Sequence, residues 1–340
     1  MDQQGRPGAA GTGATTVAQF VGMGLVWGAS FLFMKVALDG TTPVQIVWTR
    51  LVLGALALGA VVLVTRSPLP RTRALWGHFA VVGVVGCAVP FSLFAWAEQH
   101  VTSGVASIYN ATTPLMTALM VTLAFRVERL TRERLAGVGV GLAGVVVISA
   151  PWQLASGSGS SAEVAGQLAC LGAALCYGVT FAYLRRFVTP HRVPAVTTAF
   201  LQVGFGAVAL LLLTPWVVAT PVDPTPAVVG SLVVLGVLGT GVAYLWNITV
   251  LQRWGPTATS TVTYITPVVG VALGVLVLDE RLGWHEPAGA ALVLLGILLA
   301  QGRLRRRAVR VPAVVESSVV DPVVAGAPAA AAGTAGRDLP

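Results

Sequence analysis

The sequence has 340 residues, of which 55% are hydrophobic and only 10% are charged, and its mean hydropathy is +0.81. Soluble domains carry roughly a quarter charged residues, so this composition excludes an ordinary soluble protein. The net charge of +8 and the pI of about 10.2 are compatible with nucleic-acid binding. However, the arginines lie at the ends of apolar stretches rather than on one folded face, which argues against that function.

Taken in chain order, the apolar stretches predict membrane-spanning helices. Many reach the roughly 20 residues that cross a bilayer, and they do not alternate as the strands of a transmembrane barrel do. We predict an all-α membrane protein with ten transmembrane helices. The spans are Val17–Val36, Val44–Val64, Ala74–Trp96, Val105–Phe125, Leu135–Ala150, Val164–Leu184, Ala195–Val217, Ala227–Leu251, Thr257–Leu278 and Pro287–Gln301. The fifth and tenth are short, so we expect them to extend into the flanking loops.

The segments outside the spans are polar or of low complexity. Residues 1–16 are predicted to be disordered, and they lack the features of a cleaved signal peptide. The linker at 151–163 contains SGSGSS, which is typical of a flexible connection. Residues 303–340 begin with arginines and continue without amphipathic periodicity, so we expect a disordered tail.

A long segment of the chain occurs twice. The region from Ala106 to Gly144 is matched by the region from Thr259 to Gly296. Corresponding positions are Pro114 and Pro267, Glu-Arg-Leu at 128–130 and 280–282, Gly137 and Gly289, Gly144 and Gly296, and WGASF at 27–31 and YGVTF at 177–181. Repetition on this scale predicts two related halves, at residues 17–150 and 164–302.

The placement of arginine predicts the orientation of these halves. With the N-terminus inside, the arginines at 66–73, 126–134, 185–192 and 303–310 all fall on the cytoplasmic side, as the positive-inside rule requires. Both termini are therefore expected in the cytoplasm. Because each half has five spans, the second half enters the membrane from the opposite side, and we predict two inverted five-helix repeats. Many secondary transporters have this arrangement, with the substrate near the midplane between the repeats.

These motifs resemble the EamA family of the drug/metabolite transporter superfamily. The resemblance is carried by WGASFLFMK at 27–35, Arg50 and the duplicated Pro…Glu-Arg-Leu…Gly…Gly segments, and it covers about residues 17–302. It implies a ten-helix carrier of small metabolites, often amino acids or related compounds, coupled to an ion gradient or to exchange. The halves have diverged, since Lys35 is matched by Arg185 and no cation matches Arg50 near Leu201.

Four charged residues near the predicted outer side are candidates for charge recognition or gating. Lys35 and Asp39 have helical ion-pair spacing, and Arg50 lies roughly 10 Å into the second span, where a charge usually faces a cavity or a partner. The two cations could attract a substrate carboxylate, pair with Glu98 or Asp39 as an outer gate, or extend to the headgroups. Glu98 could carry a coupling proton if burial raised its pKa, but we favour an exposed loop residue.

The remaining candidates are predicted to line a central cavity, with packing between helices as the alternative for each. Pro114 and Pro267 would kink their spans, and the hydroxyls of Thr112, Thr113 and Thr266 could satisfy the freed carbonyl groups. The substrate-cavity candidates are Trp27, Ser30, Phe31, Arg50, Tyr109, Asn110, Pro114, Tyr177, Thr180, Tyr183, Trp246, Asn247, Tyr264 and Pro267. Aromatic and small polar side chains suit a mostly apolar pocket with few specific contacts.

Several other motifs favour structural roles. Glu128-Arg129 and Glu280-Arg281 lie at span ends, where capping and topology explain them. The glycine pairs 137/141 and 270/274 have the small-xxx-small spacing that allows close helix contact. The cysteines at 87, 170 and 176 lie in apolar stretches without metal-ligand spacing, so we expect buried small side chains, and no metal or cofactor.

The sequence therefore predicts a carrier that moves a small-molecule substrate across the cytoplasmic membrane by alternating access. Amino acids or other small zwitterions are the expected class, export is favoured over import, and protons or another ion are candidate coupling partners. A lipid-linked carrier or flippase and a multidrug exporter of the same superfamily remain alternatives. A channel explains the duplication less well, and an intramembrane enzyme would need convergent catalytic groups within the spans.

Overall fold

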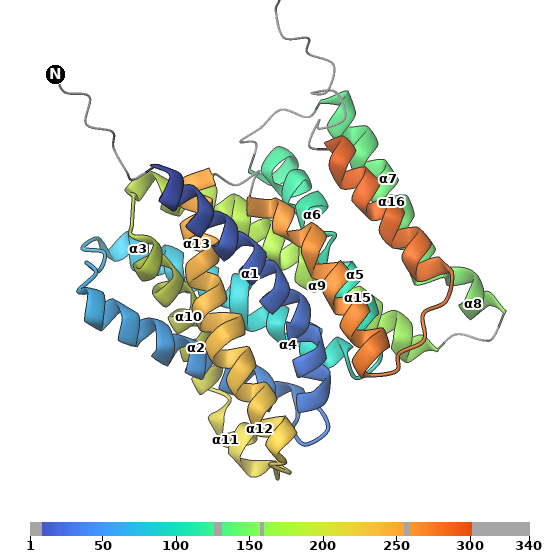
Figure 1. The fold of residues 1–340 in the computed structure, drawn as a ribbon, viewed down its shortest axis with the longest axis horizontal. Coiled ribbons are helices and arrows are strands. Elements are labelled where there is room, and N and C mark those ends of the chain that lie inside the picture. Colours follow the sequence, from blue (N-terminus) through green and yellow to red (C-terminus); the bar gives the residue numbers. More distant parts are fainter. Residues whose placement is uncertain (1–8, 126–130, 157–159, 255–258, 301–340) are drawn as a thin grey trace, which may run out of the picture. The chain divides into compact units, whose positions relative to one another are not determined.

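The computed structural model describes residues 9–125, 131–156, 160–254 and 259–300, and this part of the chain is helical, without a strand (Figure 1). The predicted Glu128-Arg129 pair and the tail at 303–340 lie outside the described residues. Helix α1 begins at Ala9, so helix extends into the stretch 1–16 that we expected to precede it. The all-helical class of the prediction is confirmed for the described residues.

The helices of the two halves follow the predicted spans. In the first half they are α1 (Ala9–Ala37), α2 (Pro43–Thr65), α3 (Arg73–Gly83), the π-helix η1 (Val84–Ala88), α4 (Val89–Ala97), α5 (Ser103–Asn110), α6 (Thr113–Leu119), the π-helix η2 (Met120–Ala124), α7 (Arg132–Ser149) and α8 (Pro151–Ala155). In the second half they are α9 (Ser161–Tyr183), η3 (Leu184–Val188), η4 (Thr189–His191), α10 (Ala195–Leu211), α11 (Thr214–Ala219), α12 (Pro226–Val233), η5 (Val234–Val242), α13 (Ala243–Trp254), η6 (Ser260–Tyr264), α15 (Ile265–Val277) and α16 (His285–Ala300).

Six of these helical stretches are long and apolar enough to cross a membrane. They are Gly13–Ala37, Pro43–Thr65, Arg73–Ala97, Arg132–Gln153, Ser161–His191 and Pro226–Trp254, and shorter apolar helices cover Ala195–Leu211, Thr261–Val277 and His285–Ala300. The predicted fourth span is not one continuous helix, because it divides into α5, α6 and η2. A multi-pass membrane protein is therefore confirmed, whereas ten separate spanning helices stay a prediction.

Proline and threonine explain where the chain starts and breaks its helices. Thr42 and Gln45 form a capping box at α2, in which the Thr42 amide donates to Gln45 Oε1 at 2.8 Å. Pro114 lies in the first turn of α6, where its missing N–H is harmless. Pro267 is buried in α15, and the Thr266 hydroxyl donates to the Val262 carbonyl at 3.3 Å. Both predicted prolines therefore lie near the start of a helix that follows a break.

Many large apolar side chains point outward. Leu56, Leu63 and Leu276 expose 65%, 78% and 78% of their surface, respectively. A soluble monomer rarely leaves so much contiguous apolar surface in water, whereas a bilayer covers such residues. The exposed leucines therefore agree with the membrane assignment.

Close glycine contacts join the two halves. Each contact between two glycines is repeated by the corresponding glycines, with the roles of the two halves exchanged. A Cβ atom on Gly137 would lie 2.5 Å from the Gly296 oxygen, and one on Gly144 would lie 2.7 Å from the Gly289 oxygen. These glycines hold α7 directly against α16 (Figure 1). Because Gly137 corresponds to Gly289 and Gly144 to Gly296, the exchanged contacts are consistent with two repeats related by a pseudo-two-fold axis.

A second exchanged pair lies beside the two predicted prolines. Gly28 of α1 packs on Val269 of α15, where a Cβ atom added to the glycine would lie 2.5 Å from the valine Cβ. Gly178 of α9 packs on Met116 of α6, where an added Cβ atom would lie 2.7 Å from the methionine carbonyl carbon. Gly28 corresponds to Gly178, and both partners lie two residues after a matched proline. The halves therefore meet through the segments that the sequence repeats.

Candidate functional site

Six aromatic side chains from four helices form a connected cluster in the centre of the core. They are Trp27 and Phe31 of α1, Phe91 and Phe94 of α4, Tyr177 of α9 and Tyr244 of α13. Neighbouring ring centroids lie 5.4 Å (Phe31–Phe94), 6.2 Å (Phe94–Tyr177), 6.5 Å (Phe91–Tyr177), 6.3 Å (Phe91–Tyr244) and 5.9 Å (Trp27–Tyr244) apart. These separations are typical of interacting rings. The cluster therefore joins both halves through aromatic contacts.

Arg50 enters this cluster from α2. Its side chain is 5% exposed, its guanidinium carbon lies 3.9 Å from the centroid of the Phe91 ring, and its Nε donates to the Thr240 hydroxyl at 2.8 Å. Thr240 in turn donates to the Leu235 carbonyl in η5. No ion pair joins Arg50 to a carboxylate among the described residues. The alternative in which Arg50 extends to the headgroups does not hold, because Phe91 of α4 and Thr240 of η5 contact this buried side chain.

A small polar patch adjoins the guanidinium. A Cβ atom on Gly239 would lie 3.7 Å from Arg50 Nη2 and 3.1 Å from Ser30 Oγ, and Trp27 Nε1 donates to the Gly239 carbonyl at 3.1 Å. The absence of a side chain on Gly239 leaves its backbone open to the guanidinium and the serine hydroxyl. Trp27, Ser30 and Arg50 were all predicted cavity residues, and the structure brings them together.

Other buried polar atoms have no hydrogen-bond partner among the described residues. Asn247 Oδ1 of α13 and Gln202 Oε1 of α10 are both unpaired, although most buried polar atoms in proteins are hydrogen-bonded. Thr180 of α9 is buried too, but its hydroxyl donates to the Cys176 carbonyl at 2.8 Å. Unpaired acceptors inside the core of a helical membrane protein are candidates for contact with a polar ligand.

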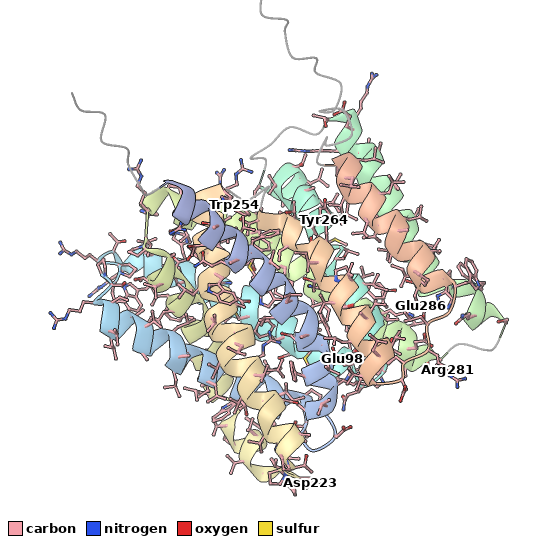
Figure 2. All side chains as sticks on the ribbon, viewed as in Figure 1. Glu98, Asp223, Trp254, Tyr264, Arg281 and Glu286 are labelled. Atoms are coloured by element: carbon pink, nitrogen blue, oxygen red, sulfur yellow. The ribbon has the colours of Figure 1, made fainter. Side chains whose placement is uncertain are left out.

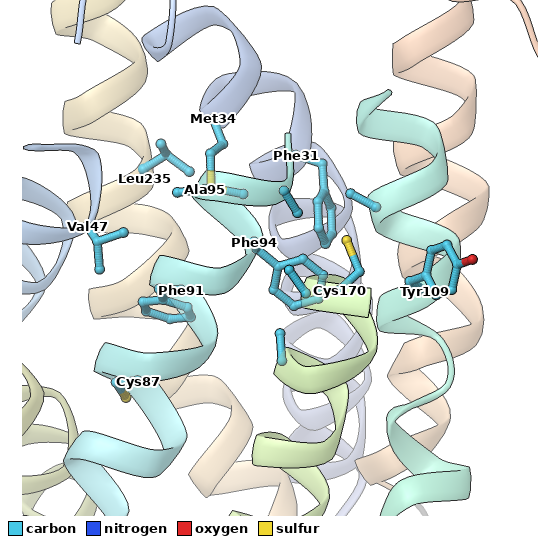
Figure 3. Close-up of a cluster of buried hydrophobic side chains, with 14 of the residues drawn as sticks. Phe31, Met34, Val47, Cys87, Phe91, Phe94, Ala95, Tyr109, Cys170 and Leu235 are labelled. Atoms are coloured by element: carbon cyan, nitrogen blue, oxygen red, sulfur yellow. The ribbon is translucent and has the colours of Figure 1, made fainter. Parts of the chain in front are cut away.

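Three predicted cavity residues serve packing instead. The Tyr109 hydroxyl bonds to Ser149 of α7 at 2.7 Å, and Figure 3 shows it directed away from Phe91 and Phe94. Tyr183 bonds through its hydroxyl to His78 at 2.8 Å, in a separate group of rings with Phe125 and Phe187. Trp246 packs on Gly22 of α1, where an added Cβ atom would lie 2.8 Å from the indole ring.

The last cavity candidates belong to α5, α6, η6 and α15. Asn110 is half-buried at the end of α5, and Pro114 follows in α6. Tyr264 lies at the opposite end of the helices from Arg281 (Figure 2). Pro267 is buried in α15.

The charged gating candidates adopt a different arrangement from the predicted one. Lys35 Nζ donates to the backbone carbonyls of Glu98 and Val101, at 2.5 and 3.2 Å, so no Lys35–Asp39 ion pair forms and Asp39 is exposed. Glu98 is 0% exposed. The expectation of an exposed loop residue is therefore wrong, because Lys35 of α1 and Gly166 of α9 contact the turn that carries Glu98.

The predicted structural role of Glu280 is confirmed. Its carboxylate accepts hydrogen bonds from the Ser103 amide at 2.7 Å, the Ser103 hydroxyl at 3.0 Å and the Gly104 amide at 2.9 Å. These groups open α5, where a helix leaves its first amides unpaired and favours a negative charge. A carboxylate of the second half thus caps a helix of the first half.

Sequence reasoning missed Phe91, Phe94, Thr240 and Tyr244. Tyr244 stands three residues before Asn247 in α13 and contacts Trp27 of α1 and Phe91 of α4, whereas Trp246 packs on Gly22 of α1. Phe91 and Phe94 have the same spacing, which places them on one side of α4. This spacing was the available signal. Within the described part of the chain, no group of His, Cys, Asp and Glu side chains could hold a metal ion.

Comparisons with known proteins agree with this arrangement. The model of the EamA-like transporter family matches residues 15–150 and 164–301. The "Probable amino-acid metabolite efflux pump" of Escherichia coli (strain K12) is 28% identical over 305 residues, which cover 84% of this chain and 95% of that protein. The "Probable terminal-alkyne amino-acid exporter" of Streptantibioticus cattleyicolor is 27% identical over 295 residues, covering 85% and 94%.

Two further likenesses concern the membrane location and the fold. The "Uncharacterized inner membrane transporter YedA" of Escherichia coli (strain K12) is 24% identical over 278 residues, covering 81% of this chain and 87% of that protein. A crystal structure with 23% sequence identity superposes with a TM-score of 0.60 and covers 87% of this chain and 99% of the other. At this identity the structural likeness shows a shared fold.

Proposed function

Because this chain belongs to the EamA-like transporter family, we propose that it is a secondary transporter that exports small carboxylate-bearing metabolites, amino acids or related compounds, across the cytoplasmic membrane. The exchanged glycine contacts support transport by alternating access, since two-fold related halves can swap inward-open and outward-open arrangements. The names of two relatives, an amino-acid metabolite efflux pump and an amino-acid exporter, support both the substrate class and the direction. The arginine distribution supports cytoplasmic termini.

The observation that carries the substrate class is Arg50. A guanidinium inside a membrane protein is costly and usually serves a substrate or ion pathway. Its hydrogen bond to Thr240 uses Nε, and no other hydrogen bond or ion pair joins it to the described residues. The two terminal nitrogens have the fork geometry that binds a carboxylate through two parallel hydrogen bonds.

The surroundings of Arg50 fit the rest of a small amphipathic molecule. The aromatic rings of Phe91, Tyr177 and Tyr244 supply apolar walls, and Asn247, three residues after Tyr244 in α13, has an unpaired acceptor. Binding sites for small molecules combine mostly apolar walls with a few polar groups in this way. A lipid-linked or drug-like substrate without a carboxylate would leave the guanidinium without a counter-charge, which is why we place these alternatives second.

Counterflow into proteoliposomes tests the proposal. Purified protein is reconstituted with an unlabelled amino-acid pool inside, and entry of each labelled amino acid is compared with entry of its amide, which lacks the carboxylate. We expect the wild type to prefer the acid over the amide. Arg50→Gln should reduce the apparent affinity for the acid by about 10- to 100-fold, since a charge-assisted hydrogen bond contributes roughly 1.5–3 kcal/mol. The apparent affinity of Arg50→Lys should lie between those of the wild type and Arg50→Gln, because an ammonium group keeps the charge but cannot form the two parallel hydrogen bonds.

A matched control separates this effect from a general loss of charge. Arg71 is exposed and lies before α3, so Arg71→Gln should transport as the wild type does. Unchanged affinity and unchanged acid preference in Arg50→Gln would rule out carboxylate recognition by this residue. Transport of lipid-linked or cationic drug-like molecules, with no amino acid carried, would instead support the alternative substrates.

A further inference from the structure

The turn between α4 and α5 is held by charged groups from both halves of the chain. Lys35 of α1 donates to the carbonyls of Glu98 and Val101 at the C-terminal end of α4. Glu280, which follows α15, accepts from the amides of Ser103 and Gly104 at the start of α5. A cation at a helix C-terminus and an anion at a helix N-terminus are both favourable, so each contact stabilises the turn in its present position.

The side chain of Glu98 lies beneath this turn and is not part of either contact. It is 0% exposed, and neither carboxyl oxygen has a hydrogen-bond partner among the described residues. An ionised carboxylate in such a place would carry a large desolvation cost. A carboxyl group without partners is therefore expected to hold a proton as long as the turn stays closed.

Charged and titratable groups face Glu98 from several elements. Lys35 of α1 and Arg50 of α2 favour its ionised form, and Glu280 opposes it. Cys170 of α9 is another titratable group near Glu98, and His100, whose ring is tilted by 60° against Trp96, is a second titratable side chain in the turn itself. Glu98 follows the apolar span Arg73–Ala97. Burial dominates these influences and raises the pKa of its carboxyl group well above the usual range.

We propose that Glu98 is a proton-binding site linked to the movement of the α4–α5 turn: the carboxyl group binds a proton when the turn closes over it and releases the proton to the adjoining solution when the turn opens. Proton binding by Glu98 stands on its own geometry, whereas its effect on transport rests on the proposed function. The proton would thus regulate access to the central cluster from this end of the helices.

The direction of the pH effect follows from linkage. The closed turn raises the pKa of Glu98, so the closed form binds more protons than the open form. The extra stability that the proton gives to the closed form is fully present below the pKa of an exposed glutamate, about 4.3. It is lost as the pH rises through the higher pKa of the closed form. Within that window each pH unit changes the ratio of open to closed turns by up to tenfold.

Lys35 provides the physical connection between the proton and the turn. While Glu98 is neutral, the ammonium group donates to the carbonyls that end α4. Once Glu98 is ionised, its carboxylate becomes the stronger acceptor for the same ammonium group. Loss of the proton therefore draws Lys35 from the backbone carbonyls and removes one of the two contacts that hold the turn.

Infrared titration of the protein in lipid tests proton binding directly. The carbonyl stretch of a protonated carboxylic acid is recorded for the wild type, Glu98→Gln and the control Asp39→Asn, whose exposed carboxylate follows the end of α1. We expect a protonated-acid band at pH 7 in the wild type and in Asp39→Asn, reduced in Glu98→Gln. An identical band in wild type and Glu98→Gln would overturn the proposal. Helicity and elution as a single species establish that each variant is folded.

The pH profile of substrate exchange then tests the link to the turn. With equal pH on both sides between 5 and 8, the wild-type rate should change several-fold. Glu98→Gln should vary by less than twofold over the same range, while Asp39→Asn and His100→Gln keep the wild-type profile. A wild-type profile in Glu98→Gln would overturn the link. If the wild type exchanges no metabolite at all, the proposed function fails, whereas the infrared result still decides whether Glu98 holds a proton.

Discussion

Replacing Glu280 with alanine should weaken the contact between the two halves at the start of α5. The change removes the acceptor of three hydrogen bonds, from the Ser103 amide at 2.7 Å, the Gly104 amide at 2.9 Å and the Ser103 hydroxyl at 3.0 Å. Ser103 is 0% exposed, so its amide cannot turn to bulk water without a movement of the turn.

The size of the effect can be worked from these contacts. A buried donor that loses its partner costs roughly 1–3 kcal/mol, and two backbone amides lose theirs. Because both lie near the end of a helix where some water can enter, we expect a total loss of about 3 kcal/mol in the free energy of unfolding. For a chain of this size, that loss lowers Tm by about 4 °C. Glu280→Gln should fall between alanine and wild type, because an amide keeps only one oxygen acceptor for three donors.

The native cysteines supply the assay. The thiols of Cys87 and Cys170 are buried in the folded chain, so a thiol-reactive fluorescent dye labels them only as the protein unfolds in detergent. The dye signal against temperature gives Tm for each variant. Far-ultraviolet circular dichroism over the same range reports the loss of helix independently.

Arg281 provides the matched control, because it is the neighbouring charge in the same loop and is exposed. Arg281→Ala should change Tm by less than about 1 °C, as surface substitutions usually shift stability by within roughly 0.5 kcal/mol. A Glu280→Ala variant with the Tm of the wild type would show that the cap contributes nothing to stability and would refute the reasoning.

Two further predictions use the same thermal assay. Gly137→Ala should lower Tm, because the new Cβ would lie 2.5 Å from the Gly296 oxygen and overpacking costs about 1–3 kcal/mol. Gly139→Ala, on the same helix with nothing within 4 Å, should leave Tm unchanged or raise it through better helix propensity, and equal behaviour of the two variants would contradict the α7–α16 packing. Tyr109→Phe should lose the hydrogen bond to Ser149, with a cost of about 1 kcal/mol and unchanged counterflow. A specific transport defect in Tyr109→Phe, with normal stability, would return this residue to the substrate site.

Single segments of the sequence were enough to predict the class of the fold. Apolar stretches in a chain with 10% charged residues indicate membrane helices, since the length and apolar character of each stretch are enough to predict that it crosses a bilayer. The repeated glycines also predicted close helix contact correctly, because only a residue without a side chain allows backbones to approach as α7 and α16 do. The break at the fourth span was expected only as a kink at Pro114, whereas the chain ends α5 at Asn110 and begins α6 at Thr113.

The face that each side chain presents was harder to infer. Trp246 and Tyr244 are two residues apart in α13, and only the packing of α13 against α1 and α4 decides that Tyr244 enters the aromatic cluster. Arg50 illustrates the same limit, since its depth in the span allowed either a headgroup contact or a buried site. The covering residues Phe91 and Thr240 come from α4 and η5.

The sequence by itself therefore determined that this protein is a helical membrane protein built from two related halves, because hydropathy and repetition are properties of the chain that need no partner. The tertiary structure decided the surroundings of the charged residues. Glu98 follows an apolar span and has the sequence context of a surface loop, yet it is buried, and the turn that carries it contacts α1 and α9 while Glu280 caps the helix that follows. Glu280 lies 177 residues from Ser103, and the burial of a carboxyl group depends on such distant neighbours rather than on the residues beside it in the chain.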